Sequence, residues 1–281
     1  PKNLNWYGES MSPTKPVNRR VTIEDLDTPE WKDIVLEMHS MMSVPKEKMH
    51  KFAYCTDRRS LIHRAEFESL KHWEYPWLIK HGEFKPGAKL LDCGCGRGIL
   101  QFYLAKKGYN VTSVDISTLK TRQIQAAWNI MRKVGAPIKE NKASAMNAMA
   151  RRYGTSIDFH VSNIAKLPFA DETFDNVYSV SVLEHMAKGE DVMAIKEMSR
   201  VLKKGGTMLV TVDFSPVKME RKAYTKEELL ELIAASGLNF NNNYDFEVQD
   251  WDKYLSDLTA AFSKKNKCQV SSAAFVLKKK E

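Results

Sequence analysis

Short apolar runs alternate with amphipathic stretches along the second two thirds of the chain. Five runs rich in Val, Ile and Leu are predicted to be buried strands: Lys89–Cys93, Asn110–Asp115, Ile157–Val161, Asn176–Val180 and Thr207–Val212. The stretches between them have the mixed pattern of helices, over residues 98–107, 117–134, 142–152 and 190–202. Such alternation is typical of an α/β fold, in which a doubly wound parallel sheet carries helices on both faces.

The first 85 residues follow a different pattern. Residues 1–27 are polar and contain prolines, which predicts irregular structure. Thr28-Pro29 is a good helix start, and that helix should run to about Met42. A second helix is predicted over residues 60–81, with a bend at Pro76. We therefore expect a helical extension over residues 1–85 that covers the site of a main domain over residues 86–281.

The C-terminal part departs from simple alternation. Thr225 and Glu228 have the spacing of a capping box, which predicts a helix from there to about Ser236, closed by Gly237. Two late strands are predicted near residues 244–249 and 269–277. A helical insertion over residues 251–262 separates them.

Composition indicates a folded protein without a membrane span. Apolar residues make up 43% and charged residues 28% of the 281 residues. The polar residues 1–20 do not resemble a signal peptide, and the four cysteines include no Cys-x-x-Cys pair, so we expect reduced thiols in the cytoplasm. Residues 264–281 carry six lysines and one glutamate, which is +5 of the net charge of +8. Because the basicity lies mostly on one tail, it gives little support to a nucleic-acid partner.

A glycine-rich turn follows the first predicted strand, in the sequence Asp92-Cys93-Gly94-Cys95-Gly96-Arg97-Gly98. Glycines let the backbone turn sharply and let a ligand approach closely at the carboxyl end of a strand, where open α/β sheets bind ligands. A dinucleotide fingerprint would need its third glycine at Ile99, which argues against an NAD-linked oxidoreductase. The observed D-x-G-x-G-x-G resembles motif I of the class I S-adenosylmethionine-dependent methyltransferases.

Four further segments resemble motifs of the same family in the same order. Asp115 ends the second strand, where a carboxylate can accept both hydroxyls of a ribose or, alternatively, cap the next helix. Asn163 and Ile164 follow the third strand, at positions where the family contacts adenine; a turn asparagine is the alternative. The segments 174–185 and 200–210 resemble the fourth and fifth strands with their loops.

The resemblance covers about residues 86–279 and is strongest to the small-molecule branch that includes ubiquinone and menaquinone biosynthesis methyltransferases. It implies three layers around a seven-stranded sheet of order 3-2-1-4-5-7-6, with the last strand antiparallel. It also implies S-adenosylmethionine as cofactor, S-adenosylhomocysteine as product and no metal. The cofactor-binding residues that it implies are Asp92, Gly94, Cys95, Gly96, Gly98, Asp115, Ile116, Asn163, Ile164 and Val180.

The reaction of this family is an in-line displacement at a methyl group, so the protein mainly aligns the reactants and excludes water. Candidate bases are His185 and Glu184, which could instead cap the following loop or pack on the sheet. Tyr178 is expected in the core. An arginine or tyrosine from residues 54–59 is a candidate ligand of the methionine carboxylate.

The acceptor is expected to be a small molecule. An RNA or protein methyltransferase, or a non-catalytic module that binds S-adenosylmethionine, are the alternatives. Amino-directed base methylases carry Asn/Asp-Pro-Pro-aromatic after the fourth strand, and Ser179-Val180-Ser181-Val182 has no proline. The acceptor atom and the oligomeric state stay open.

Overall fold

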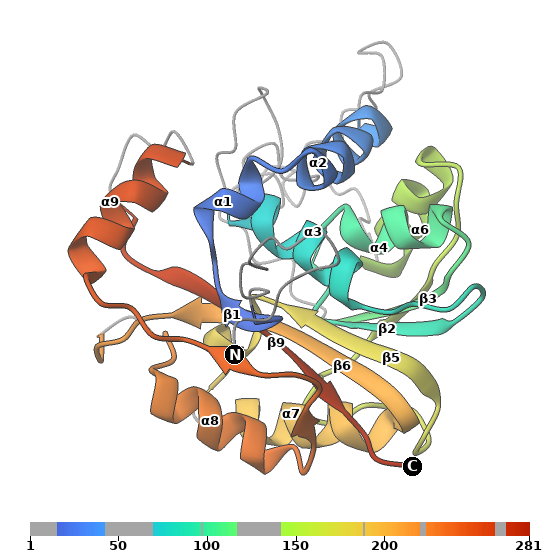
Figure 1. Cartoon of the computed structure of the whole chain (residues 1–281). Coiled ribbons are helices and arrows are strands. Elements are labelled where there is room, and N and C mark those ends of the chain that lie inside the picture. The colour runs from blue at the N-terminus through green and yellow to red at the C-terminus, as the bar shows by residue number, and fades with distance from the viewer. Residues whose placement is uncertain are drawn as a thin grey trace, which may run out of the picture.

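The computed structural model describes residues 16–42, 70–96, 98–116, 142–187, 189–219, 223–261 and 268–281 (Figure 1). The strands are β1 (Asn18–Arg20), β2 (Lys89–Cys93), β3 (Asn110–Asp115), β4 (Asp158–Val161), β5 (Phe174–Val180), β6 (Leu202–Phe214), β7 (Asn239–Phe240), β8 (Tyr244–Asp245) and β9 (Ser271–Lys278). The helices are α1 (Ile23–Leu26), α2 (Pro29–Met42), α3 (Lys71–His81), α4 (Leu100–Lys106), α6 (Lys142–Arg152), α7 (Glu190–Val201), α8 (Lys226–Ala235), α9 (Trp251–Ala261) and the 3-10 turn η3 (Leu183–His185).

The strands form one mixed sheet in the order β4-β3-β2-β5-β6-β9-β1-β8, with β7 also paired to β9. The run from β4 to β6 is parallel, and β9 lies antiparallel to β6. The predicted doubly wound α/β fold is therefore confirmed. The predicted strands 1 to 5 correspond to β2, β3, β4, β5 and β6, and the predicted seventh strand to β9.

The sheet differs from the prediction at its β9 edge, where the N-terminal region joins it. Residues 18–20 form β1, antiparallel to β9, so the expectation of irregular structure there was wrong. The side chain of Asn18 replaces part of the strand ladder: its Oδ1 accepts from Val276 N at 2.7 Å and its Nδ2 donates to Asn242 O at 2.7 Å. A strand anchored by buried polar side chains carries no apolar alternation that sequence could reveal.

The strand predicted near residues 244–249 is found only in part, as the short strand β8, and a second short strand, β7, lies on the other side of Asn241–Asn243. β7 pairs with β9, whereas β8 pairs in parallel with β1. Asparagine favours turns, so the run of three asparagines interrupts the extended chain. The predicted helices 142–152 and 190–202 are found within one residue as α6 and α7, and α3 matches the second half of the helix predicted over 60–81. The helix predicted at 117–134 and residues 60–69 lie outside the described residues.

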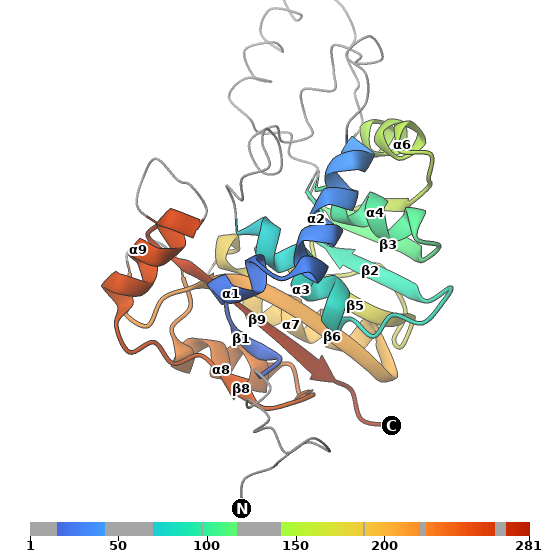
Figure 2. The same cartoon turned by 45° about the horizontal axis from the view of Figure 1, so that its top comes forward.

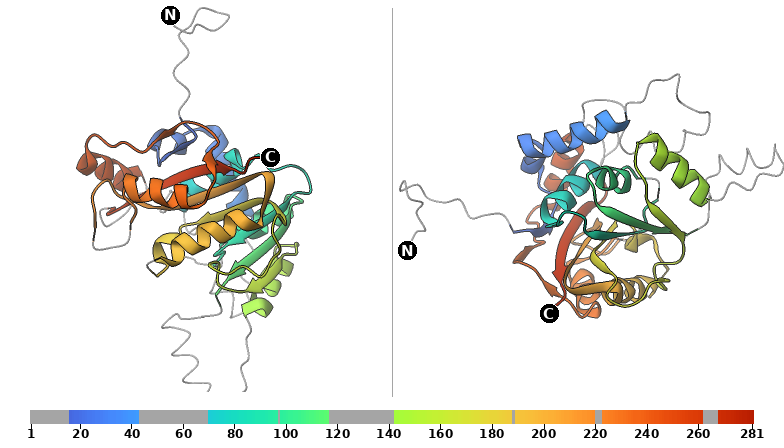
Figure 3. Two further views of the ribbon diagram at one scale, coloured as in Figure 1. Left: turned by 90° about the horizontal axis from the view of Figure 1, so that it is seen from below. Right: turned by 90° about the vertical axis from the view of Figure 1, so that its right-hand side faces the viewer.

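Two cores lie on opposite faces of the sheet and make three layers. Leu90 and Tyr178 belong to the core under α1–α4, α6 and α9, whereas their neighbours Leu91 and Val177 belong to the core under α7 and α8. Alternate strand residues thus face opposite layers. From below, α7 and α8 lie across one face of the sheet (Figure 3). In the other layer, α9 and α6 lie at opposite ends, with α3 between them (Figures 1 and 2).

Candidate cofactor and acceptor site

A glycine turn at the carboxyl end of β2 forms the centre of the candidate site. Gly94 and Gly96 have φ values of 80° and 54°, a left-handed conformation that glycine adopts without steric cost. The amides of Gly94 and Cys95 donate to Val114 O on β3 at 2.8 and 3.1 Å. The turn is therefore fixed against the neighbouring strand.

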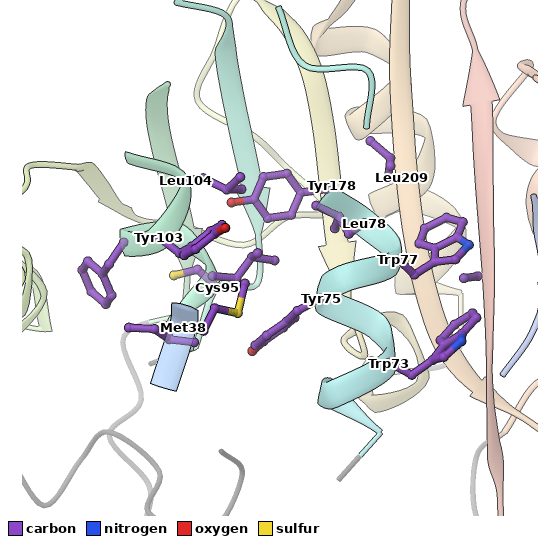
Figure 4. Close-up of a cluster of buried hydrophobic side chains, with 14 of the residues drawn as sticks. Met38, Trp73, Tyr75, Trp77, Leu78, Cys95, Tyr103, Leu104, Tyr178 and Leu209 are labelled. Atoms are coloured by element: carbon purple, nitrogen blue, oxygen red, sulfur yellow. The ribbon is translucent and has the colours of Figure 1, made fainter. Parts of the chain in front are cut away.

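Two other elements press against this turn. A Cβ added to Gly94 would lie 2.6 Å from both methyl groups of Val182, the second residue after β5. A Cβ added to Gly98 would lie 2.7 Å from the hydroxyl of Tyr75 on α3. Figure 4 shows the ring of Tyr75 extending from α3 to the side on which Cys95 lies. Close packing and a left-handed φ thus require glycine at position 94, whereas Tyr75 leaves little room for a side chain at position 98.

Asp115 connects the end of β3 to the glycine turn. Its Oδ2 accepts from Gly96 N at 2.7 Å and its Oδ1 from Ile116 N at 2.6 Å. The side chain of Ile116 is 53% exposed, and that of Val161, in register with Asp115 on β4, is 46% exposed. Exposed apolar side chains next to a fixed carboxylate can bind a group that has an apolar ring and a polar sugar.

Asn163 and Ile164 lie beyond the end of β4, near Asp115. Ser162 N donates to Asp115 O at 3.0 Å, which brings this loop to the same edge of the sheet. The Oδ1 of Asn163 accepts from Ala165 N at 2.9 Å, as in an Asx turn. Ile164 is buried and packs in the core on the α7 side. Of the apolar residues here, Ile116 and Val161 are the exposed ones.

Asp92 precedes the turn on β2 and is only 5% exposed. Burial raises its pKa to about 8; the hydroxyl of Tyr178 acts to lower the pKa, and the nearby charge of Asp115 raises it further. The carboxyl group is therefore largely protonated near neutral pH. A cationic ligand at the turn would favour its ionised form.

A second buried acid, Glu184, lies on η3 just after β5. The residue is 2% exposed; its Oε1 accepts from Asp213 N at 3.1 Å, and its Oε2 has no hydrogen-bond partner among the described residues. Burial and the neighbouring Asp213 carboxylate raise its pKa to about 8. A buried acid with such a pKa can exchange a proton near neutral pH.

Glu74 on α3 is fully buried beside these groups. Its Oε2 pairs with Lys71 Nζ at 2.8 Å, and its Oε1 accepts from Ser181 at 2.8 Å and Ser272 at 2.7 Å. Burial acts to raise the pKa of Glu74, but Lys71 and the two hydroxyls outweigh it, so the net pKa is lowered. Glu74 is therefore an ionised acid, paired with Lys71, that connects α3 to the end of β5 and the start of β9.

The other predicted candidates are less close to the turn or lie elsewhere. His185 is exposed on η3, and Val180 is half-buried, with Lys71 Nζ 3.4 Å from its carbonyl oxygen. Tyr178 is buried as expected. Residues 54–59, the predicted source of a carboxylate ligand, lie outside the described residues.

Sequence reasoning expected the N-terminal extension to cover the site but did not identify Lys71 and Glu74 of α3 as residues that reach it. Lys71, Glu74 and Tyr75 all reach the ends of β2 and β5 from this helix. One signal was available: Glu74 is a single acid inside the aromatic run Trp73–Trp77, where a charged residue needs a buried partner. Trp73 and Trp77 themselves are buried and stack with ring centroids 6.1 Å apart.

Two features of the described residues bear on the class of site. Among the helices in these ranges, none has both the length and the apolar composition that crossing a bilayer requires. In the same ranges, no three or more His, Cys, Asp or Glu side chains are grouped so that they could hold a metal ion.

Comparisons with known proteins find similarity to methyltransferases. Residues 91–210 match a family model described as a methyltransferase domain. The chain is 29% identical over 134 residues to the methyltransferase GfsG of Streptomyces halstedii. This alignment covers 47% of this chain and 40% of that protein. The chain is 27% identical over 197 residues to the ubiquinone biosynthesis O-methyltransferase of Chromobacterium violaceum, covering 63% and 71% of the two chains.

One solved structure, of the [4+2]-cyclase SpnF, matches with a TM-score of 0.53 and 20% identity over 94% of this chain and 98% of that one. This likeness shows the fold alone. The chain spans 40% to 52% of the length of three curated relatives, from S. halstedii, Haemophilus influenzae and Methanocaldococcus jannaschii. Residues 91–210 are thus similar to a methyltransferase domain, a family that implies S-adenosylmethionine as the cofactor.

Proposed function

We propose that this protein transfers the methyl group of S-adenosylmethionine to a small-molecule acceptor. The observation that carries the proposal is the glycine turn after β2 with the Asp115 carboxylate fixed beside it at 2.7 Å from Gly96 N. Relatives named for methyl transfer, including an O-methyltransferase of ubiquinone biosynthesis, support a small acceptor.

Each side of the turn has a proposed role in holding the cofactor. Asp115 accepts the ribose hydroxyls, and Ile116 and Val161 pack against the adenine ring, with Asn163 and Ile164 closing that end. The turn residues Gly94, Cys95, Gly96 and Gly98 pass close to the amino-acid portion, together with Asp92 and Val180. The sulfonium of the bound cofactor supplies an activated methyl group, so these residues need only bind, orient and exclude water.

The acceptor site is proposed at the carboxyl ends of β5 and β6, under α3. Glu184 is the candidate for accepting a proton from the acceptor, because its Oε2 is unpaired within the described residues and burial raises its pKa to about 8. His185, exposed on the same turn, is the second candidate. The helical segment over residues 1–85 is proposed to cover this side of the site.

The test is a transfer assay with S-adenosylmethionine labelled in its methyl group. The full chain is incubated separately with small-molecule, protein and RNA fractions of a cell extract. Label in the small-molecule fraction, with equimolar S-adenosylhomocysteine, is the expected result. Label only in the RNA or protein fraction would show that the acceptor is a macromolecule and would contradict the proposed small-molecule acceptor.

A second candidate is a protein that binds the cofactor without transferring its methyl group. The likeness to a protein named as a [4+2]-cyclase supports this second candidate function, because one fold can host more than one chemistry. Binding of S-adenosylmethionine with no labelled product in any fraction would support it.

A further inference from the structure

Ser181 has an unusual backbone conformation at the centre of the candidate site. Its φ is +52°, a left-handed value that residues with a Cβ adopt at an energetic cost. Two other described non-glycine residues, Glu83 and Glu172, share this sign, and both are exposed. Ser181 instead follows β5 directly, beside the glycine turn.

The surrounding structure determines this conformation from two sides. Ser181 N donates to Thr211 O on β6 at 2.9 Å, and its Oγ donates to Glu74 Oε1 on α3 at 2.8 Å. The acceptor of the second bond is a buried carboxylate whose charge Lys71 balances. A charge-assisted bond of this kind is stronger than one between neutral groups.

The conformation of Ser181 fixes the position of the next residue, Val182. The two methyl groups of Val182 lie 2.6 Å from the position that a Cβ on Gly94 would occupy. Tyr75, next to Glu74 on α3, contacts the other end of the turn at Gly98 in the same way. Adjacent residues of α3 thus brace both ends of the glycine turn, one directly and one through Ser181.

We propose that Glu74 is a positioning residue for the cofactor: it holds Ser181 in its left-handed conformation, which keeps Val182 packed on Gly94 and the turn in its binding shape. The inference rests on the proposed cofactor site. It assigns to α3 a role in binding that lies outside the family motifs.

The chain provides a matched control. Ser272 on β9 donates to the same oxygen of Glu74, at 2.7 Å, but does not contact the turn through Val182. Ser181→Ala and Ser272→Ala therefore each remove one hydrogen bond to Glu74 Oε1. Only the first also removes a bond that holds a residue in an unfavourable left-handed conformation.

The experiment is isothermal titration of the full-length variants with S-adenosylhomocysteine, with thermal unfolding as a check of folding. Ser181→Ala should weaken binding by about tenfold or more, since small displacements in a binding site have large effects. Ser272→Ala should change the affinity by less than about twofold. Ser181→Gly, which adopts positive φ freely, should lie between the two.

A second set of variants tests whether Glu74 acts on the turn through Ser181. This test still applies if Ser181→Ala unfolds. Glu74→Gln should also weaken binding, and Ser181→Gly should then add little to it. Full additivity, or equal affinities of the Ser181 and Ser272 variants, would overturn the proposal alone. Absence of binding by the wild-type protein would overturn the proposed function as well, so the two failures are distinguishable.

Discussion

The role of a single carboxylate, Asp115, can be tested most directly. We predict that Asp115→Ala weakens S-adenosylmethionine binding by about 10- to 100-fold, since a hydrogen bond to a charged group contributes about 1.5–3 kcal/mol. Asp158→Ala is the control, because Asp158 is an exposed acid on the neighbouring strand β4. Calorimetric titration measures both. Equal affinities of the two variants would remove Asp115 from the site.

Glu184 should make stability depend on pH. Its pKa in the folded protein is about 8 and its ordinary value is 4.5, so the folded state binds more protons between these limits. This contribution is complete below about pH 4.5 and is lost as the pH rises to about 8, by up to about 1.4 kcal/mol per pH unit.

Glu184→Gln removes the ionisable group and should remove that loss. Urea unfolding from pH 5 to 9 is therefore expected to show the variant gaining stability relative to wild type up to about pH 8, and no further above it. The exposed Glu227→Gln serves as the control. A constant difference across this range would mean that Glu184 is not buried as a protonated acid.

The sequence predicted the local parts of the site better than its long-range contacts. The glycine turn and Asp115 lie in contiguous motifs whose physical role can be recognised from neighbouring residues. The bond between Glu74 and Ser181 joins residues 107 positions apart, and no periodicity indicates such a pair. The exposure of Val161 at the sheet edge likewise depends on β4 being the last strand.

At the scale of elements, a buried ion pair attaches the N-terminal segment to α3. Asp25 Oδ2 accepts from Arg19 at 2.7 Å and from Trp73 Nε1 at 2.9 Å, with Thr22 as a third donor. Burial acts to raise the pKa of Asp25, but the three donors outweigh it, so the net pKa is lowered. The carboxylate is thus the common acceptor of β1, the start of α1 and α3.

Asp25→Ala should destabilise the fold by about 3–5 kcal/mol, because it leaves the buried Arg19 charge uncompensated. The exposed Asp27, which pairs with Lys32 at 3.2 Å, provides Asp27→Ala as a control with a change below about 1 kcal/mol. Urea unfolding of both variants provides the comparison. A loss for Asp25→Ala no larger than that of the control would show that this network does not hold the segment.

Helices were more predictable than short strands. Their caps and 3.6-residue periodicity are local, as in α8, where Thr225 accepts from Glu228 N and Glu228 accepts from Thr225 N, as predicted. β1, β7 and β8 have two or three residues each and obtain their partners from distant parts of the chain. Elements of that length have no sequence period to detect.

At the scale of the whole molecule, the order of the strands from β4 to β9 followed from the resemblance to a family. Composition and alternation alone established the parallel α/β class. The extra edge made by β1 and β8 lies beyond the pattern of that family, and it draws the N-terminal segment into the same sheet as the cofactor turn. The boundary proposed at residue 85 therefore separates segments that are packed together.

The central claim is that the turn after β2 binds S-adenosylmethionine and its demethylated product. Isothermal titration of the wild-type chain with S-adenosylhomocysteine tests this claim, and a parallel titration with NADH serves as its comparison. We predict saturable one-site binding of S-adenosylhomocysteine and no heat with NADH. Saturable binding of NADH with no heat from S-adenosylhomocysteine would contradict the account.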